Sequence, residues 1–288
     1  MRISLTSSPS SCNAVHRLCH VAGPALVLYE HIDRDDFGTS VDNMRFFLKV
    51  GLLPPHRATF IFIATGCHSI AFPTALPNVH VIDRPTSSRC GTIGAWHAGL
   101  IHAHSIAGGL KFSHFVLLSS RVRGPFLPSW APPTLDWLHH YSVLLKPPVA
   151  LVGPIVSCEH GLSSLHLKGL PLVIERRAAL EHLLPILSTC PGSEADTTDL
   201  LASLSHRLLE AGHSLRALAQ GFLPNIEASI ASWPLLRRGC SRGPPFHPHP
   251  LESLFVVTST ALRDLLPPLL TQEVVRYTRL VDLGKSSS

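Results

Sequence analysis

Short apolar segments that alternate with helix-like segments are the feature that most restricts how this chain can fold. Each apolar segment is too short for a typical helix and ends at polar or turn-forming residues, as buried strands do. The segments between them repeat apolar residues every three or four positions, which is typical of amphipathic helices. We predict strands at residues 25–30, 59–64, 79–82, 114–118 and 149–152, and helices at residues 39–50, 93–106, 176–187 and 200–211.

This alternation is typical of α/β proteins, in which helices flank a mostly parallel sheet. We therefore predict a single α/β domain at residues 24–283. Its Pro-, Gly- and Arg-rich part, Trp233–Pro250, is expected to form a loop. Ligands bind such sheets beyond the carboxyl ends of the strands. This rule selects four loops as candidate binding segments, namely residues 30–39, 83–94, 119–130 and 153–166.

The first 23 residues differ from the rest in composition. They are rich in serine, contain Arg2 and Arg17, lack aspartate and glutamate, and lack the apolar core of a secretory signal. We predict that residues 1–23 form a disordered or targeting segment outside the domain.

The overall composition excludes several classes of protein. With 45% hydrophobic and 15% charged residues, the chain is too apolar for a disordered protein. Its longest apolar runs fall far short of the roughly 20 residues that cross a bilayer, so we predict no transmembrane segment. The net charge is +5, but lysine and arginine are scattered, so no nucleic-acid surface is predicted. The mild excess of positive charge suits small anionic ligands.

The seven cysteines do not form a recognisable metal-binding pattern. Their number is odd and no Cys-x-x-Cys pair occurs, which argues against a zinc module. We expect buried free thiols. In an oxidising compartment, a Cys158–Cys190 or a Cys67–Cys90 bridge remains an alternative.

Two segments at the ends of predicted strands have the residue types that hold phosphate. Residues 119–126 combine hydroxyl groups with two guanidinium groups and a Gly-Pro turn. Residues 83–94 are rich in hydroxyl groups and glycine just before a predicted helix, where backbone N–H groups attract anions. Neither segment is a P-loop or a Gly-x-Gly-x-x-Gly motif, and a solvated turn is the alternative for each.

Two motifs carry most of a resemblance that covers residues 26–258 in order. One is Val-Arg-Gly-Pro-Phe-Leu-Pro at residues 122–128, and the other is His-Pro-Leu-Glu-Ser-Leu-Phe at residues 249–255. With them, the chain resembles a family of fungal, plant and algal glycosyltransferases that is distantly similar to rhamnan-synthesis proteins and has a GT-A-like fold. The other similar segments are residues 28–30, 42–48, 60–63, 79–84, 94–95, 115–121, 151–153 and 208–212, together with Gly51, Cys90, Trp130, Cys158 and His166.

The resemblance implies transfer of a sugar from a nucleotide-sugar donor to a glycan or another hydroxyl acceptor. Such an enzyme would act in polysaccharide biosynthesis, with the Golgi or endomembrane system as its compartment and manganese or magnesium as a candidate cofactor. The base that deprotonates the acceptor would be Glu175, Asp199 or His166. The implied donor-binding residues are Arg84, Ser88, Thr92, Gly94, Ser119, Ser120, Arg121 and Arg123.

Some positions depart from the family pattern. Ser88 and Thr92 stand where members of the family typically have asparagine and aspartate, and no Asp-x-Asp motif follows the fourth predicted strand. A neutral hydroxyl cannot replace a carboxylate that balances a divalent cation. The alternative is therefore a catalytically degenerate GT-A-like domain that acts as a binding or interaction protein. A third interpretation is an unrelated α/β enzyme that binds phosphate.

Overall fold

A seven-stranded mixed sheet forms the centre of the computed structural model, which describes residues 24–32, 39–85, 90–108, 110–127, 135–157, 166–218 and 254–257. The strand order is β10-β6-β9-β4-β1-β2-β3. Its strands are β1 (Ala25–Ile32), β2 (Ala58–Thr65), β3 (Val79–Arg84), β4 (His114–Ser119), β6 (Val149–Gly153), β9 (Leu172–Glu175) and β10 (Ser214–Ala217). Two small sheets pair β5 (Val122–Arg123) with β11 (Val256–Val257), and β7 (Ile155–Ser157) with β8 (His166–Lys168).

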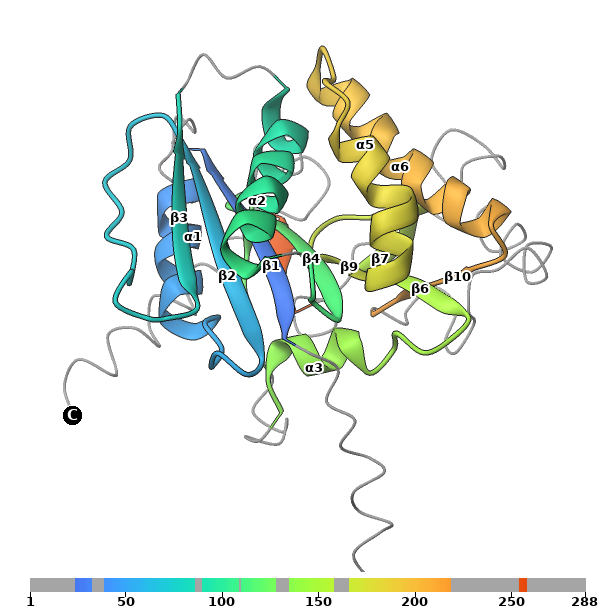
Figure 1. Cartoon of the computed structure of the whole chain (residues 1–288), viewed down its shortest axis with the longest axis horizontal. Helices are drawn as coiled ribbons and strands as arrows, with labels where there is room; N and C mark the ends of the chain where they lie inside the picture. The colour runs from blue at the N-terminus through green and yellow to red at the C-terminus, as the bar shows by residue number, and fades with distance from the viewer. Residues whose placement is uncertain are drawn as a thin grey trace, which may run out of the picture.

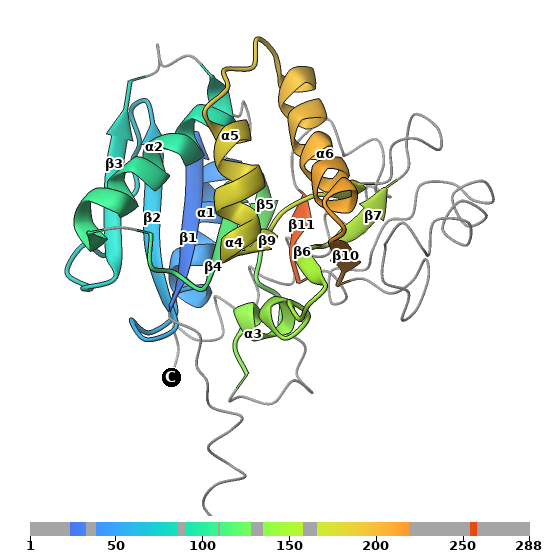
Figure 2. The same ribbon diagram turned by 45° about the vertical axis from the view of Figure 1, so that its right-hand side comes forward.

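Helices cover both faces of this sheet (Figures 1 and 2). On one face lie α2 (Gly91–Ala107), a helical run made of α4 (Arg176–Ala178), a π-helical segment (Ala179–Leu183) and α5 (Leu184–Leu187), and α6 (Glu194–Glu210). On the other face lie α1 (Thr39–Val50) and α3 (Trp137–Ser142). We call these the α2 face and the α1 face.

Alternation along β1 explains why both faces are covered. Successive side chains of a strand point to opposite sides of the sheet. Leu26 and Leu28 pack in the core under α2, whereas Val27 and Tyr29 pack in the core under α1. Since both sets are fully buried, the strand reads as a continuous apolar run, as the sequence indicated.

The structure confirms the α/β class, the mostly parallel sheet with flanking helices, and all five predicted strands. The predicted helices are also present, although α6 begins at Glu194, before the predicted start at residue 200, because Ser193 caps it. Two strands of the main sheet were not predicted: β9, which lies antiparallel between β4 and β6, and β10, which is parallel to β6. Each has only four residues, too few to show a period.

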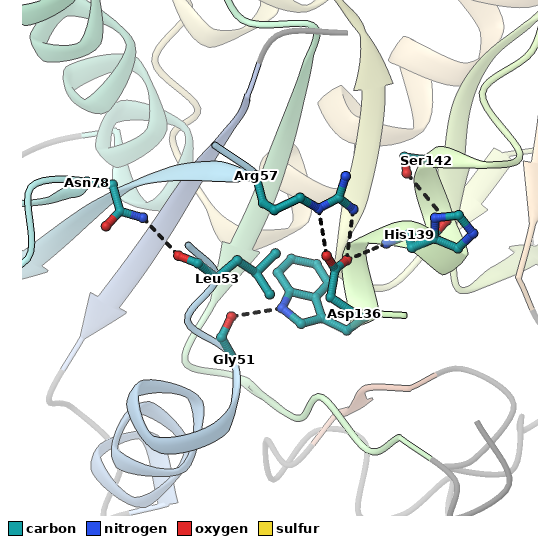
Figure 3. Close-up of polar contacts among 8 residues, drawn as sticks. Gly51, Leu53, Arg57, Asn78, Asp136, His139 and Ser142 are labelled. Atoms are coloured by element: carbon teal, nitrogen blue, oxygen red, sulfur yellow. Dashed lines mark hydrogen bonds and ion pairs between the residues drawn. The ribbon is translucent and has the colours of Figure 1, made fainter. Parts of the chain in front are cut away.

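Polar contacts fix α3 to the end of the sheet (Figure 3). Asp136, the N-cap of α3, accepts hydrogen bonds from the His139 N–H (2.8 Å) and from Arg57 Nε (2.7 Å). Burial opposes ionisation of Asp136, but these hydrogen bonds hold its pKa below the ordinary value. The Asn78 side chain donates to the Leu53 carbonyl oxygen (2.9 Å). Together these contacts hold the segments around β2 and α3.

The prediction of buried free thiols was wrong for three residues. Cys90 and Cys190 form a disulfide bond, and Cys67 is a free thiol but exposed. Neither of the two bridges considered from the sequence contains this pair. The fold explains the difference, because it places the segment before α2 against the segment before α6, although they are 100 residues apart in the chain.

Several predictions fall on segments outside the described residues. These are the N-terminal segment 1–23, the Trp233–Pro250 loop and most of the His249–Phe255 motif, of which Leu254 and Phe255 are described and buried. Among the described helices, none has the length and apolar character needed to cross a membrane.

Candidate ligand-binding site

A pocket of about 260 Å³ opens at the carboxyl-terminal edge of the parallel strands. Four separate parts of the chain line it: the end of β1 at Ile32, the start of α2 at residues 90–92, Arg121 after β4, and residues 191–194 with Thr197 at the start of α6. Figure 1 shows α2 and α6 both starting at the upper end of the molecule. The pocket therefore lies where the rule for parallel sheets places ligands.

The amino ends of two long helices face the pocket. Both α2 and α6 have 17 residues, long enough for their backbone dipoles to add up at the N-terminus. The first turn of α6 contains Glu194 and Asp196, which offset its positive field. The first turn of α2 contains no acidic residue, and its N-cap, Cys90, makes no side-chain capping bond. The start of α2 is thus the more favourable position for an anion.

Two arginines add positive charge beside this helix start. Arg121 lines the pocket, forms an ion pair with Glu194 across it, and donates its backbone N–H to Ser119 Oγ (3.1 Å). Arg84, at the end of β3, donates from Nη1 to the Gly91 carbonyl oxygen (3.3 Å). Because the Arg121 and Glu194 side chains are 43% and 72% exposed, their ion pair contributes little to stability and can exchange for a ligand.

A buried carboxylate lies beside these groups. Glu30 precedes Ile32 by two positions on β1, so both side chains point to the α2 face, and Glu30 is 1% exposed. The Thr92 hydroxyl donates to its carboxylate, but Oε1 has no hydrogen-bond partner among the described residues. Burial raises the pKa of Glu30 to about 7, against the opposing effects of Thr92, Arg121 and Arg84.

The structure brings some of the predicted donor-binding residues to this pocket. Thr92 and Arg121 line it, while Arg84 and Ser119 lie next to it through their contacts with Gly91 and Arg121. Gly94 lies inside α2, where its N–H bonds to the Cys90 carbonyl oxygen (2.9 Å). Ser88 is outside the described residues.

Arg123 does not join this group. It is 2% exposed on the α1 face, where it forms an ion pair with Asp42 (3.0 Å) and lies over the Phe46 ring (4.6 Å). The sequence prediction grouped Arg123 with Arg84 as donor-binding residues. The structure separates them, since Arg84 lies on the α2 face of the sheet and Arg123 on the α1 face. Strand β5 turns the chain under α1, so two arginines only two residues apart, Arg121 and Arg123, face different surroundings.

Ser120 also lies away from the pocket lining. Its carbonyl oxygen accepts a hydrogen bond from Asn43 Nδ2 of α1 (2.8 Å), and its Oγ accepts from the Ile32 N–H (3.5 Å). Ser120 thus joins the end of β1 to α1.

None of the three predicted catalytic residues lines the pocket. Glu175 lies at the opposite edge of the sheet, because β9 is antiparallel and pairs Glu175 with His114 at the start of β4. There its carboxylate caps α4 by accepting the Ala178 N–H (3.1 Å). Asp199 is exposed on α6, and His166 is buried in β8.

Sequence reasoning missed Glu30 as a site residue, although Glu30 lies in a segment that carries the resemblance. One signal was present, since Glu30 is a charged residue near the carboxyl end of an otherwise apolar strand. Around the pocket, the described carboxylates are Glu30, Glu194 and Asp196, which accepts the N–H of the lining residue Gly192 (3.0 Å). The described residues contain no group of three or more histidine, cysteine, aspartate or glutamate side chains that would hold a metal ion. A manganese or magnesium requirement remains a prediction.

The pocket therefore has a helix N-terminus, Arg121 and the hydroxyl groups of Thr92, Ser193 and Thr197 in its lining, and Arg84 and the buried Glu30 carboxylate lie beside it. These groups suit a ligand with phosphate charge. Comparison with protein-family models and with curated proteins finds no match for this chain.

Proposed function

We propose that the chain is a GT-A-like glycosyltransferase that binds a nucleotide sugar in this pocket and transfers the sugar to a glycan or another hydroxyl acceptor. One observation carries the proposal. Four segments that are far apart in the sequence meet at a single pocket, and they bring the start of α2 together with Arg121. The mostly parallel sheet with flanking helices supports it, because the resemblance implies such a fold.

Each group at the pocket has a role in this proposal. The donor diphosphate lies against the start of α2 and pairs with Arg121, replacing Glu194. Arg84 adds to the positive field from the end of β3. These groups stabilise the negative charge that develops on the leaving nucleotide as the bond to the sugar breaks. The acceptor hydroxyl loses its proton to a base, and Glu194 is the carboxylate among the described residues that line the pocket, rather than one of the three predicted candidates.

A second candidate function is a catalytically degenerate domain that binds a nucleotide sugar or glycan without transfer. The placement of Glu175, Asp199 and His166 favours it, because none of them lines the pocket. Donor binding is common to both candidates, so transfer itself separates them.

Ligand-induced stabilisation tests the proposal. UDP, GDP and TDP, each with and without manganese, are added to the full chain, and thermal unfolding is recorded. One nucleotide should stabilise the chain above the others, by about 3 kcal/mol at 100 times its dissociation constant. No shift with any nucleotide contradicts donor binding. A shift without release of nucleotide from the matching nucleotide sugar, across a panel of glycan acceptors, favours the degenerate domain.

The two neighbouring arginines provide a matched pair of variants. Arg121→Ala should weaken binding of the stabilising nucleotide about tenfold or more, because it removes a charge-assisted contact. Arg123→Ala should leave the affinity unchanged and lower the free energy of unfolding by roughly 2–3 kcal/mol, since Arg123 is buried but its partner Asp42 is half-exposed and can be solvated. Calorimetric titration and urea unfolding measure both. Equal loss of affinity in the two variants would contradict this assignment.

A further inference from the structure

Glu30 is a buried titratable group that the proposed transfer does not use. It lies on the same face of β1 as the pocket-lining Ile32, and it accepts a hydrogen bond from Thr92, which also lines the pocket. Its electrostatic partners include Arg121, again a lining residue, and Arg84. An anion in the pocket and the Glu30 carboxylate would therefore share the same positive groups.

We propose that the pocket takes up a proton when it binds a phosphate-bearing ligand, and that Glu30 is the residue that accepts this proton. The inference rests on the proposed function in so far as the ligand is a nucleotide sugar. It adds that ionised Glu30 competes with the ligand, so that occupancy of the site depends on pH.

The groups that face Glu30 come from four neighbouring elements. Thr92 belongs to α2, Arg121 follows β4, Arg84 ends β3, and Glu194 begins α6. Ser119 is the partner of Glu30 in the register of β4 and points to the same face, where its hydroxyl accepts the Arg121 N–H. The chain neighbour His31 points to the α1 face and contacts His68, which pairs with Asp83.

The charges in this cluster set the direction of the coupling. In the protein without ligand, burial raises the pKa of Glu30 to about 7, and the two arginines limit that rise. A bound phosphate group adds negative charge close to Glu30 and engages the same arginines. Both effects disfavour the ionised carboxylate, so the pKa of Glu30 rises further in the complex.

The sign of the pH dependence follows from this shift. Well below pH 7 Glu30 is neutral in both states and contributes no pH dependence. Above about pH 7 it is largely ionised in the free protein and becomes protonated on binding, so affinity falls as pH rises, by up to about tenfold per pH unit for one proton. The decline ends above the pKa of Glu30 in the complex.

Calorimetric titration of the full chain tests the proposal. The probes are UDP-glucose, GDP-mannose and inorganic sulfate, measured at pH 6 and pH 8 in buffers with different ionisation enthalpies. In the nucleotide sugars the diphosphate is esterified at both ends, so they lack the second phosphate ionisation near about pH 6. Each probe that binds should take up about half a proton or more at pH 8 and much less at pH 6.

Two glutamine variants separate Glu30 from its neighbour. Glu30→Gln keeps the shape of the side chain but removes the proton acceptor, so uptake should vanish and affinity at pH 8 should rise several-fold. Glu194→Gln removes the carboxylate that pairs with Arg121, so affinity should rise while the uptake persists. Thermal unfolding at both pH values verifies that each variant is folded, and Glu30→Gln should be at least as stable as the native chain at pH 8.

The outcomes distinguish this inference from the proposed function. Nucleotide-sugar binding without proton uptake, or with uptake that persists in Glu30→Gln, overturns the role of Glu30 and leaves the proposed function in place. Sulfate binding with Glu30-dependent uptake, when neither nucleotide sugar binds, supports Glu30 and counts against the proposed function. Absence of binding by all three probes overturns both.

Discussion

Replacing both Cys90 and Cys190 with serine is expected to lower the free energy of unfolding by roughly 4–5 kcal/mol. The disulfide joins residues 100 positions apart. A cross-link of this span removes much conformational freedom from the unfolded chain, and its loss restores that freedom. The bond also ties the start of α2 to the segment before α6, and both segments line the pocket, so nucleotide affinity should fall with it.

Urea unfolding of the double variant measures this effect, and native chain treated with a reductant should match it. Cys67→Ser is the control, because Cys67 is free and exposed, and its change should stay within about 0.5 kcal/mol. A double variant as stable as this control would contradict the prediction.

Trp137→Ala is expected to lower the free energy of unfolding by about 3–5 kcal/mol. Trp137 is 1% exposed, and its ring packs edge-on against Phe47 of α1 (6.0 Å between centroids) and against Phe255 (5.5 Å). Its Nε1–H donates to the Gly51 carbonyl oxygen (2.8 Å) at the end of α1. Alanine would leave a large cavity at this junction and an unpaired carbonyl group.

Trp137→Phe is the matched control, because it keeps an aromatic ring and removes the hydrogen bond. It should cost about 1–2 kcal/mol. Urea unfolding of both variants gives the comparison. The prediction fails if alanine costs no more than phenylalanine, which would mean that the ring contributes little to the packing. Since Trp137 lies on the α1 face, neither variant should change nucleotide affinity while the chain remains folded.

The placement of the site could be predicted only in part. The rule that ligands bind beyond parallel strands selected the loops containing Thr92 and Arg121, because that rule depends on strand direction alone. It also selected Arg123, which the structure buries under α1 beside Asp42. Residue type does not distinguish Arg121 from Arg123. The path of the chain after β4 does, and that path depends on the pairing of β5 with β11 from the far end of the described sequence.

Glu30 illustrates the same division. The sequence showed that Glu30 lies at the end of an apolar strand. Its pKa could not be predicted, because it depends on burial and on arginines from β3 and the turn after β4. Glu175 illustrates the converse. It also ends a strand, yet β9 runs antiparallel, so its carboxylate lies at the other edge of the sheet and caps α4. Strand direction is a property of the assembled sheet and not of the four residues that form β9.

The sequence by itself determined five of the parallel strands and the main helices, because apolar periodicity within each segment specifies which side chains become buried. Tertiary structure alone decided which distant segments meet: the insertion of β9 between β4 and β6, the pairing of Cys90 with Cys190, and the gathering of Glu30, Thr92 and Arg121 at one pocket. The physical reason is that burial, charge and bonding at these positions arise between residues far apart in the chain, whose contacts exist only after the layers have packed.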